Sequence, residues 1–345
     1  MLNIKKILLP VDFPNASVRV VHQAATLAHH FHSEIVMLHV ATAQSHAAGV
    51  PEVDPELVGW DMLAEITREA VKNLDHSLGP ELDGLAIRRV LVKGDPAQAI
   101  LQTAQVEKAD LIMMPSHGYT FDQFLLGSVT AKVLHGSECP VWTGAHVEES
   151  QAQEFAIRNV LCAVDFGPRS HKTAAWAAQM AAEFGARLTL AHVTASVEIW
   201  GPGGSYAKPE WKEALVSDAS QHLAELQQDL GIKAEVFISS GDVPRALSQA
   251  AKQTKADLLV TECYPYGGNL RIHGYAIICA VPIPVLSVSR PLLVARNPPV
   301  SRPMGSNRAS HDLKGQQIKI RKRASGRSPR CRLLARNCFW LVAES

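Results

Sequence analysis

The sequence lacks the features that mark membrane, secreted and zinc-binding proteins. No stretch reaches the length of about 18 apolar residues that a membrane span needs. The N-terminal segment Met1–Pro10 has no signal-peptide cleavage site and is typical of a strand, so we expect a cytoplasmic protein that does not bind a membrane. The six cysteines form no C-x-x-C pair and have no zinc-finger spacing, which favours small buried thiols in a reducing compartment.

Catalytic motifs are also missing. The sequence has no Walker A lysine motif, no G-x-S-x-G nucleophile elbow and no recognisable pair of base and nucleophile, so we expect no dedicated enzyme. The histidine-rich tract His29–His32 has no carboxylate or cysteine pair beside it. Because cationic side chains are common at helix C-termini, we interpret the tract as a helix end and predict no protein-bound metal.

Charge is balanced over the whole chain but unevenly distributed. The formal net charge is +1, yet residues 291–345 contain 12 Lys and Arg against 2 Asp and Glu, which leaves 22 basic and 31 acidic residues in 1–290. The tail has no sustained apolar period, and its composition predicts disorder. Its basic cluster Lys319–Arg323 lacks interleaved aromatic residues, so specific nucleic-acid binding is not expected.

The chain contains a long internal repeat. The matching segments are Ile7–Phe13 with Val160–Phe166, His39-Val40 with His192-Val193, Gly94-Asp95 with Gly241-Asp242, and Pro140-Val141 with Pro284-Val285. Their order is kept and their offset drifts only from 153 to 144 residues, which indicates a duplicated domain. We predict a first domain over 1–147, a second over 155–290 and a tail over 291–345.

Each copy alternates strand and helix signals. Short apolar runs predict strands over Lys6–Asp12, Glu34–Val40, Ala86–Lys93, Asp110–Met114 and Val141-Trp142, and again over Val160–Asp165, Arg187–Val193, Lys233–Ser239, Asp257–Thr261 and Val285–Val288. Helical spacing predicts helices between them, among them Pro55–Leu78, Gly127–His135 and Pro209–Leu230. This alternation predicts an α/β fold with a parallel sheet covered on both faces. Ligands of such sheets bind beyond the carboxyl ends of the strands.

Two turns at that edge of the sheet carry candidate ligand groups. Asp12 ends the first strand, and Asp165 takes the same place in copy two. A carboxylate there either accepts hydrogen bonds from a ligand or forms an Asx turn or helix cap. After the fourth strand, Gly127-Ser128 opens a helix whose N–H groups either bind phosphate or are merely capped.

The motifs at these turns resemble those of the universal stress protein family, over about residues 3–145 and 156–289. The resemblance lies in Leu9-Pro-Val-Asp12, Gly94-Asp95, Ser116-His117-Gly118, Leu125–Leu134 and Cys139-Pro-Val. It implies a five-stranded parallel sheet of order 3-2-1-4-5 in each copy. In the ATP-binding branch of the family, an Asp at the end of strand one and the backbone at the end of strand two hold adenine, and a glycine-rich loop holds the ribose and phosphates.

Carried over to this chain, the resemblance implies a site for ATP or a related adenine nucleotide, with magnesium bound only through the nucleotide. Its residues would be Pro10, Val11, Asp12, Val40, Pro115, Ser116, His117, Gly118, Gly127, Ser128, Val129 and Thr130. Copy one departs from the family pattern at Pro115, which replaces the first glycine of the loop, and in a loop one residue shorter. Copy two has Glu262 there and no Gly-Ser before its last helix. We therefore expect a nucleotide in copy one alone.

Three functions remain open, in order of preference. The first is a nucleotide-responsive binding protein of the stress response, the second a ligand-free interaction scaffold with the same fold, and the third a weak ATPase. The fifth strands would be apolar edge strands, and edges of this kind tend to pair. We therefore expect the two copies to pair within the chain, with a homodimer as an alternative assembly.

Overall fold

Most of both repeats is described by the structure, which is a computed structural model. The described residues are 2–11, 18–41, 82–116, 126–144, 155–196, 200–201, 204–205, 209–262 and 269–288. The helix predicted over 55–78 and the tail over 291–345 lie outside them, so the disorder of the tail stays a prediction. No helix in the described part of the chain is long and apolar enough to span a bilayer.

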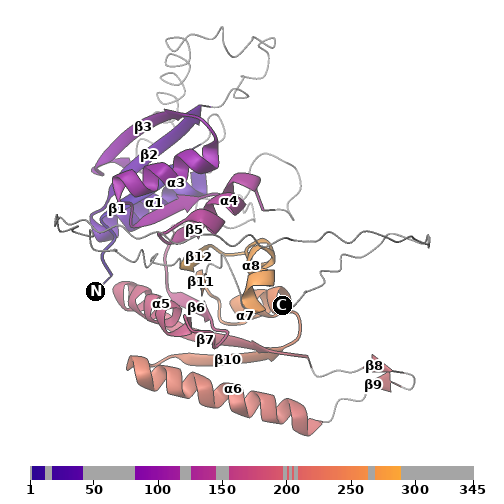
Figure 1. Ribbon diagram of the computed structural model, residues 1–345. Coiled ribbons are helices and arrows are strands. Elements are labelled where there is room, and N and C mark those ends of the chain that lie inside the picture. Colours follow the sequence, from indigo (N-terminus) through magenta and orange to yellow (C-terminus); the bar gives the residue numbers. More distant parts are fainter. Residues whose placement is uncertain are drawn as a thin grey trace, which may run out of the picture. The chain divides into compact units, whose positions relative to one another are not determined.

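Strands and helices alternate in both copies (Figure 1). Copy one contains β1 (Lys6–Pro10), α1 (Val18–Phe31), β2 (Glu34–Ala41), β3 (Ile87–Lys93), α3 (Pro96–Glu107), β4 (Leu111–Met114), α4 (Ser128–Gly136) and β5 (Val141–Thr143). Copy two contains β6 (Asn159–Ala163), α5 (Ser170–Phe184), β7 (Arg187–Thr194), β8 (Trp200–Gly201), β9 (Gly204–Ser205), α6 (Pro209–Leu230), β10 (Glu235–Ser240), α7 (Val243–Gln253), β11 (Leu258–Glu262), α8 (Asn269–Ala280) and β12 (Val285–Val288). The predicted α/β class with two copies is confirmed.

Corresponding helices of the two copies begin in the same way. The Asp95 carboxylate caps α3 by accepting a hydrogen bond from the N–H of Gln98 at 2.9 Å. The Asp242 carboxylate does the same for α7 through the N–H of Arg245, at 3.0 Å. Each cap satisfies an N–H group that the helix itself leaves without an acceptor, which explains why the helix begins there.

The strands of both copies form one ten-stranded sheet, and β8 and β9 form a separate hairpin. The order in the large sheet is β10-β7-β6-β11-β12-β5-β4-β1-β2-β3, so each half runs third, second, first, fourth, fifth strand. Pairing is parallel within each half and antiparallel where β12 meets β5. There Leu286 lies opposite Trp142, and the Thr143 hydroxyl donates to the carbonyl oxygen of Val285 at 3.2 Å.

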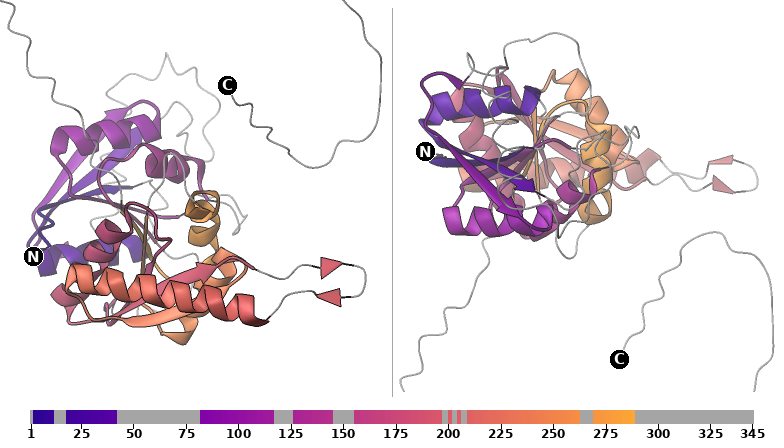
Figure 2. Two further views of the ribbon diagram at one scale, coloured as in Figure 1. Left: turned by 60° about the horizontal axis from the view of Figure 1, so that its bottom comes forward. Right: turned by 90° about the horizontal axis from the view of Figure 1, so that it is seen from above.

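The sheet buries side chains on both faces. On β1, Ile7 and Leu9 belong to one core cluster and Leu8 to the other, as the alternation of a strand requires. Figure 2 shows α1 on one face of the copy-one sheet and α3 on the other. Both clusters contain residues of both copies, which indicates that the core continues across the β5–β12 pair.

The described cysteines Cys139, Cys162 and Cys279 are free thiols. Cys162 on β6 is fully buried, and burial raises the pKa of its thiol to about 12. The reactive thiolate form of Cys162 is therefore scarce at about pH 8, and an alkylating reagent in the solvent cannot reach its sulfur. We expect iodoacetamide to leave Cys162 unmodified in the native protein and to alkylate it in denaturant, as measured by peptide mass spectrometry. Rapid native labelling of Cys162 would contradict this burial.

Candidate functional site

The first half of the candidate site lies at the end of β1. Beyond Pro10, the last residue of β1, the N–H of Val11 donates to the carbonyl oxygen of Leu38 at 2.8 Å. A second contact joins the same two segments, because Nδ1 of the His39 ring on β2 lies 3.0 Å from the carbonyl oxygen of Val11. These bonds hold the residue before Asp12 against β2, the strand that also contains the half-buried Val40. Asp12 itself lies outside the described residues.

His192 holds the corresponding backbone of copy two. Its Nδ1 lies 2.8 Å from the carbonyl oxygen of Val164, and burial lowers the pKa of its ring. Both strand-end histidines, His39 and His192, are therefore packed and hydrogen-bonded to backbone. These hydrogen bonds join the end of each second strand to the residue that follows the first strand.

The second half of the site lies between β4 and α4. The N–H of Gly127 donates to the carbonyl oxygen of Ser116 at 3.0 Å, and the Thr130 hydroxyl donates to the carbonyl oxygen of Pro115 at 3.0 Å. The structure therefore brings these four predicted residues together. The predicted residues His117 and Gly118 lie outside the described part of the chain.

The start of α4 offers backbone donors. Gly127 stands at the N-cap without a side-chain cap, and its carbonyl oxygen accepts the first helical bond from Ala131 at 2.8 Å. The N–H groups of Ser128, Val129 and Thr130 have no acceptor within the helix, because the carbonyl four residues earlier lies before its start. Donors of this kind suit an anion, and the helix dipole adds to the attraction.

The turn after β6 shows what the matching carboxylate does in copy two. Asp165 Oδ1 accepts hydrogen bonds from the N–H of Gly167 at 2.9 Å and from the Ser170 hydroxyl at 3.1 Å. A Cβ atom at Gly167 would lie 3.0 Å from the same oxygen, so glycine permits this close approach. Of the two interpretations offered for this carboxylate, Asp165 therefore follows the local one, the turn and helix start.

An ion pair crosses the end of the copy-two sheet. Arg169, just before α5, places a guanidinium nitrogen 2.9 Å from the carboxylate of Glu262 at the end of β11. The Glu262 side chain is only 4% exposed and that of Arg169 22%. Neighbouring Lys172 has a lowered pKa because it is partly buried and lies near Arg169. The pair links the turns after the first and fourth strands of copy two.

Sequence reasoning missed Arg169, although the repeat contains a signal for it. By the offsets of 153 and 147, Arg169 matches Ala16 and Glu262 matches Pro115. Two positions that are uncharged in copy one thus carry opposite charges in copy two. Opposite charges that appear together at two turns on the same edge of the sheet predict an ion pair. A comparison of the two copies would therefore have found the pair of Arg169 and Glu262.

Aromatic rings cover the same turn. Phe166 adopts a positive φ of 59°, which is rare for a bulky residue. Its ring centroid lies 4.2 Å from that of His192 and 5.1 Å from that of His222. Beneath this turn lies a cavity of about 60 Å³ that includes Asp165 and Val243 in its lining. Such a volume holds about two water molecules, and a drug-sized ligand needs several times more.

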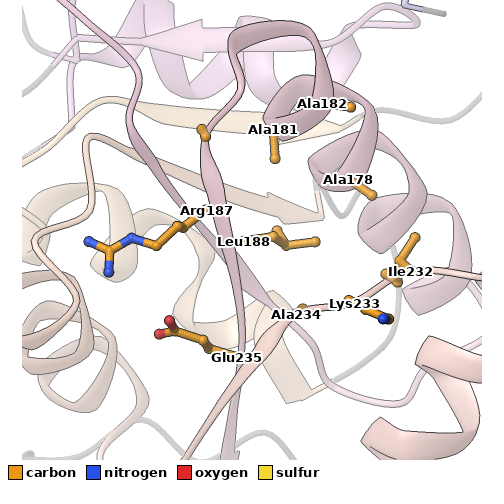
Figure 3. Close-up of a pocket in the computed structure, with 10 residues that line it drawn as sticks. Ala178, Ala181, Ala182, Arg187, Leu188, Ile232, Lys233, Ala234 and Glu235 are labelled. Carbon is orange, nitrogen blue, oxygen red and sulfur yellow. The ribbon is translucent and has the colours of Figure 1, made fainter.

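A larger groove of about 510 Å³ lies at the other end of copy two (Figure 3). Its lining includes Ala178 and Ala182 of α5, and Arg187 and Glu235 where β7 and β10 begin. It therefore sits at the amino ends of the strands, away from the edge where ligands of parallel sheets bind. Within the described residues, no group of three or more His, Cys, Asp or Glu could hold a metal ion.

Comparison with known proteins gives consistent matches to one family. The model of the universal stress protein family matches residues 3–143 and 156–264. A universal stress protein of Methanocaldococcus jannaschii is 32% identical over 138 residues, which cover 40% of this chain and 79% of that protein. A universal stress protein of Methanothermobacter thermautotrophicus is 31% identical over 141 residues, which cover 40% of this chain and 92% of that protein.

Solved structures resemble the whole pair of copies. A universal stress protein from Archaeoglobus fulgidus has a TM-score of 0.57 at 20% identity and covers 84% of this chain and 97% of its own. A protein of unknown function from Pseudomonas aeruginosa has a TM-score of 0.60 at 15% identity and covers 84% of this chain and 93% of its own. At these identities the likeness shows a shared fold.

Proposed function

The chain belongs to the universal stress protein family, and we propose that it is a binding protein that takes ATP or a related adenine nucleotide in copy one. We place its two domains at 1–147 and 155–290 and its location in the cytoplasm. The proposal includes no catalytic residue and no metal beyond magnesium carried by the nucleotide.

The start of α4 carries this proposal. Its first-turn donors at Ser128 and Val129 come after a glycine, and hydrogen bonds join this helix start to the end of β4. Because β1 and β4 are neighbouring parallel strands, Pro10 and Val11 leave the sheet at the same edge. A phosphate at the helix start and a base near Asp12 would then belong to one ligand.

Copy two supports a stoichiometry of one nucleotide per chain. Asp165 accepts hydrogen bonds from its own turn, and Glu262 is paired with Arg169 across the sheet edge. Both carboxylates that a ligand would meet are thus already engaged by groups of the protein. A phosphate would also meet the carboxylate of Glu262, which is electrostatically unfavourable.

The scaffold function has one observation in its favour. Pro115 has no N–H to offer a phosphate, and the N–H of Gly127 is already bonded to Ser116. The antiparallel β5–β12 pair supports a related proposal, that the tandem chain works as an internal pseudo-dimer. A scaffold would use this joined sheet without a ligand.

Calorimetric titration with ATP distinguishes these functions. We expect one nucleotide per chain, with affinity in the micromolar range or weaker. Asp12→Ala should weaken binding roughly twofold to tenfold, because it removes hydrogen bonds worth about 0.5–1.5 kcal/mol each. Asp165→Ala is the matched control in copy two and should leave the affinity unchanged.

Three results would overturn the proposal in different ways. An unchanged chain that binds no ATP at millimolar concentration would favour the scaffold. Equal losses of affinity from Asp12→Ala and Asp165→Ala would place nucleotide in both copies. Phosphate release with turnover would instead identify a weak ATPase.

A further inference from the structure

The side chain of Thr130 points into the molecule although it sits in the first turn of α4. It is 3% exposed, and its hydroxyl donates to the carbonyl oxygen of Pro115 at 3.0 Å. A hydroxyl in this position already has its acceptor inside the protein. The sequence predicts Thr130 as a direct nucleotide contact. Because its hydroxyl is already bonded inside the protein, its side chain needs a different role.

A second hydrogen bond joins the same two segments. The N–H of Gly127 donates to the carbonyl oxygen of Ser116, which is also buried. Two successive carbonyl groups after β4 thus accept from the start of α4. Two bonds fix both the distance and the rotation of the helix start relative to the strand end, whereas one bond would leave rotation free.

Pro115 makes this arrangement specific to copy one. Its ring fixes φ, so the acceptor carbonyl is held with less conformational freedom than a glycine would give. In copy two the matching positions are Glu262 and Gly274, by offsets of 147 and 144. Gly274 has no hydroxyl, and Glu262 forms an ion pair with Arg169 at the start of α5 instead.

We propose that Thr130 is a positioning residue, which acts through Pro115 to hold the first-turn N–H groups of α4 where they meet the phosphates of the ligand. The inference rests on the proposed nucleotide function and adds a determinant of phosphate affinity to it. Pro115 supplies the fixed acceptor that a flexible glycine would not.

The test compares Thr130→Val, which keeps the shape and removes the hydroxyl, with Thr130→Ser, which restores it. Calorimetry with ATP and with adenosine is the readout. We expect Thr130→Val to weaken ATP binding about tenfold and to change adenosine binding less than about twofold, because only the phosphate donors lose their position. Thr130→Ser should bind ATP within about twofold of the unchanged chain.

Thr194→Val is the matched control. Thr194 is also buried, and its hydroxyl donates to the carbonyl oxygen of Ser239 in copy two, at 3.3 Å. It should not alter ATP binding. Thermal unfolding verifies that each variant is folded, and Thr130→Ala replaces Thr130→Val if valine prevents folding.

Three outcomes would overturn the inference. Normal ATP affinity in folded Thr130→Val would show that the bond positions nothing, and equal losses for ATP and adenosine would show a general structural effect. Failure of Thr130→Ser to restore binding would show that the hydroxyl is not the active group. If the unchanged chain binds no ATP, the proposed function fails first, which separates that failure from these three.

Discussion

Replacing Trp142 with alanine is expected to lower the free energy of unfolding by about 3–5 kcal/mol, the usual cost of a large aromatic side chain lost from a core. Trp142 lies on β5 and is 0% exposed. Its indole N–H donates to the side-chain oxygen of Gln23 on α1 at 2.8 Å, and its ring meets that of Phe155 edge-on at 5.9 Å. Alanine would leave a cavity and an unpaired buried amide.

Equilibrium unfolding in urea measures this loss. Trp211→Ala is the control, because that side chain on α6 is 48% exposed and should cost much less. Trp142→Phe keeps most of the ring and loses the N–H, so we expect a loss of about 1–3 kcal/mol from the unpaired Gln23 amide. A loss from Trp142→Ala no larger than that from Trp211→Ala would contradict the buried position of β5 between the two copies.

Replacing Arg169 with alanine is expected to lower the free energy of unfolding by about 3–5 kcal/mol. The expected loss comes from Glu262, the partner that remains in the interior. Glu262 is 4% exposed, and without the guanidinium its buried charge would lose its ion-pair partner and keep the partly buried Lys172 nearby. Removing one member of a buried ion pair costs far more than the pair contributes when intact, because charges are poorly solvated in the interior.

A second substitution tests this explanation directly. Arg169→Ala combined with Glu262→Gln removes the stranded charge, so the double variant should recover most of the stability that Arg169→Ala loses. Urea unfolding of both single variants and the double variant completes the cycle. Equal stability of Arg169→Ala and the double variant would show that the loss has another cause, such as packing of the arginine stem.

Local patterns in the sequence predicted many of the described elements and the repeat. A short continuous apolar run predicted β1, and Ile7, Leu8 and Leu9 are all buried, with their side chains divided alternately between the two core clusters. Asp95-Pro96 is a sequence pattern typical of a capped helix start, and the Asp95 cap is present. The first strand is shorter than expected and ends at Pro10 instead of Asp12. The predicted ends of these elements agree with the structure to within a few residues, because the backbone conformation there depends on neighbours in the chain.

The candidate site could be located from sequence but not completed. The strand–helix alternation placed Gly127 at the ligand edge, yet the family resemblance counted Thr130 among the residues that contact the ligand. The structure instead turns the hydroxyl of Thr130 toward the Pro115 carbonyl. Which way a side chain points at a helix start depends on where the preceding strand ends, and this is set by packing of the sheet.

The sequence by itself determined that this is a duplicated α/β chain of the universal stress protein family with unequal copies. Only the tertiary structure decided that Arg169 pairs with Glu262 and that Thr130 bonds to Pro115. The reason is physical. Strand and helix formation follow from periodicity along the chain, whereas these contacts join segments distant in sequence whose distance and direction are fixed only when the whole sheet has packed.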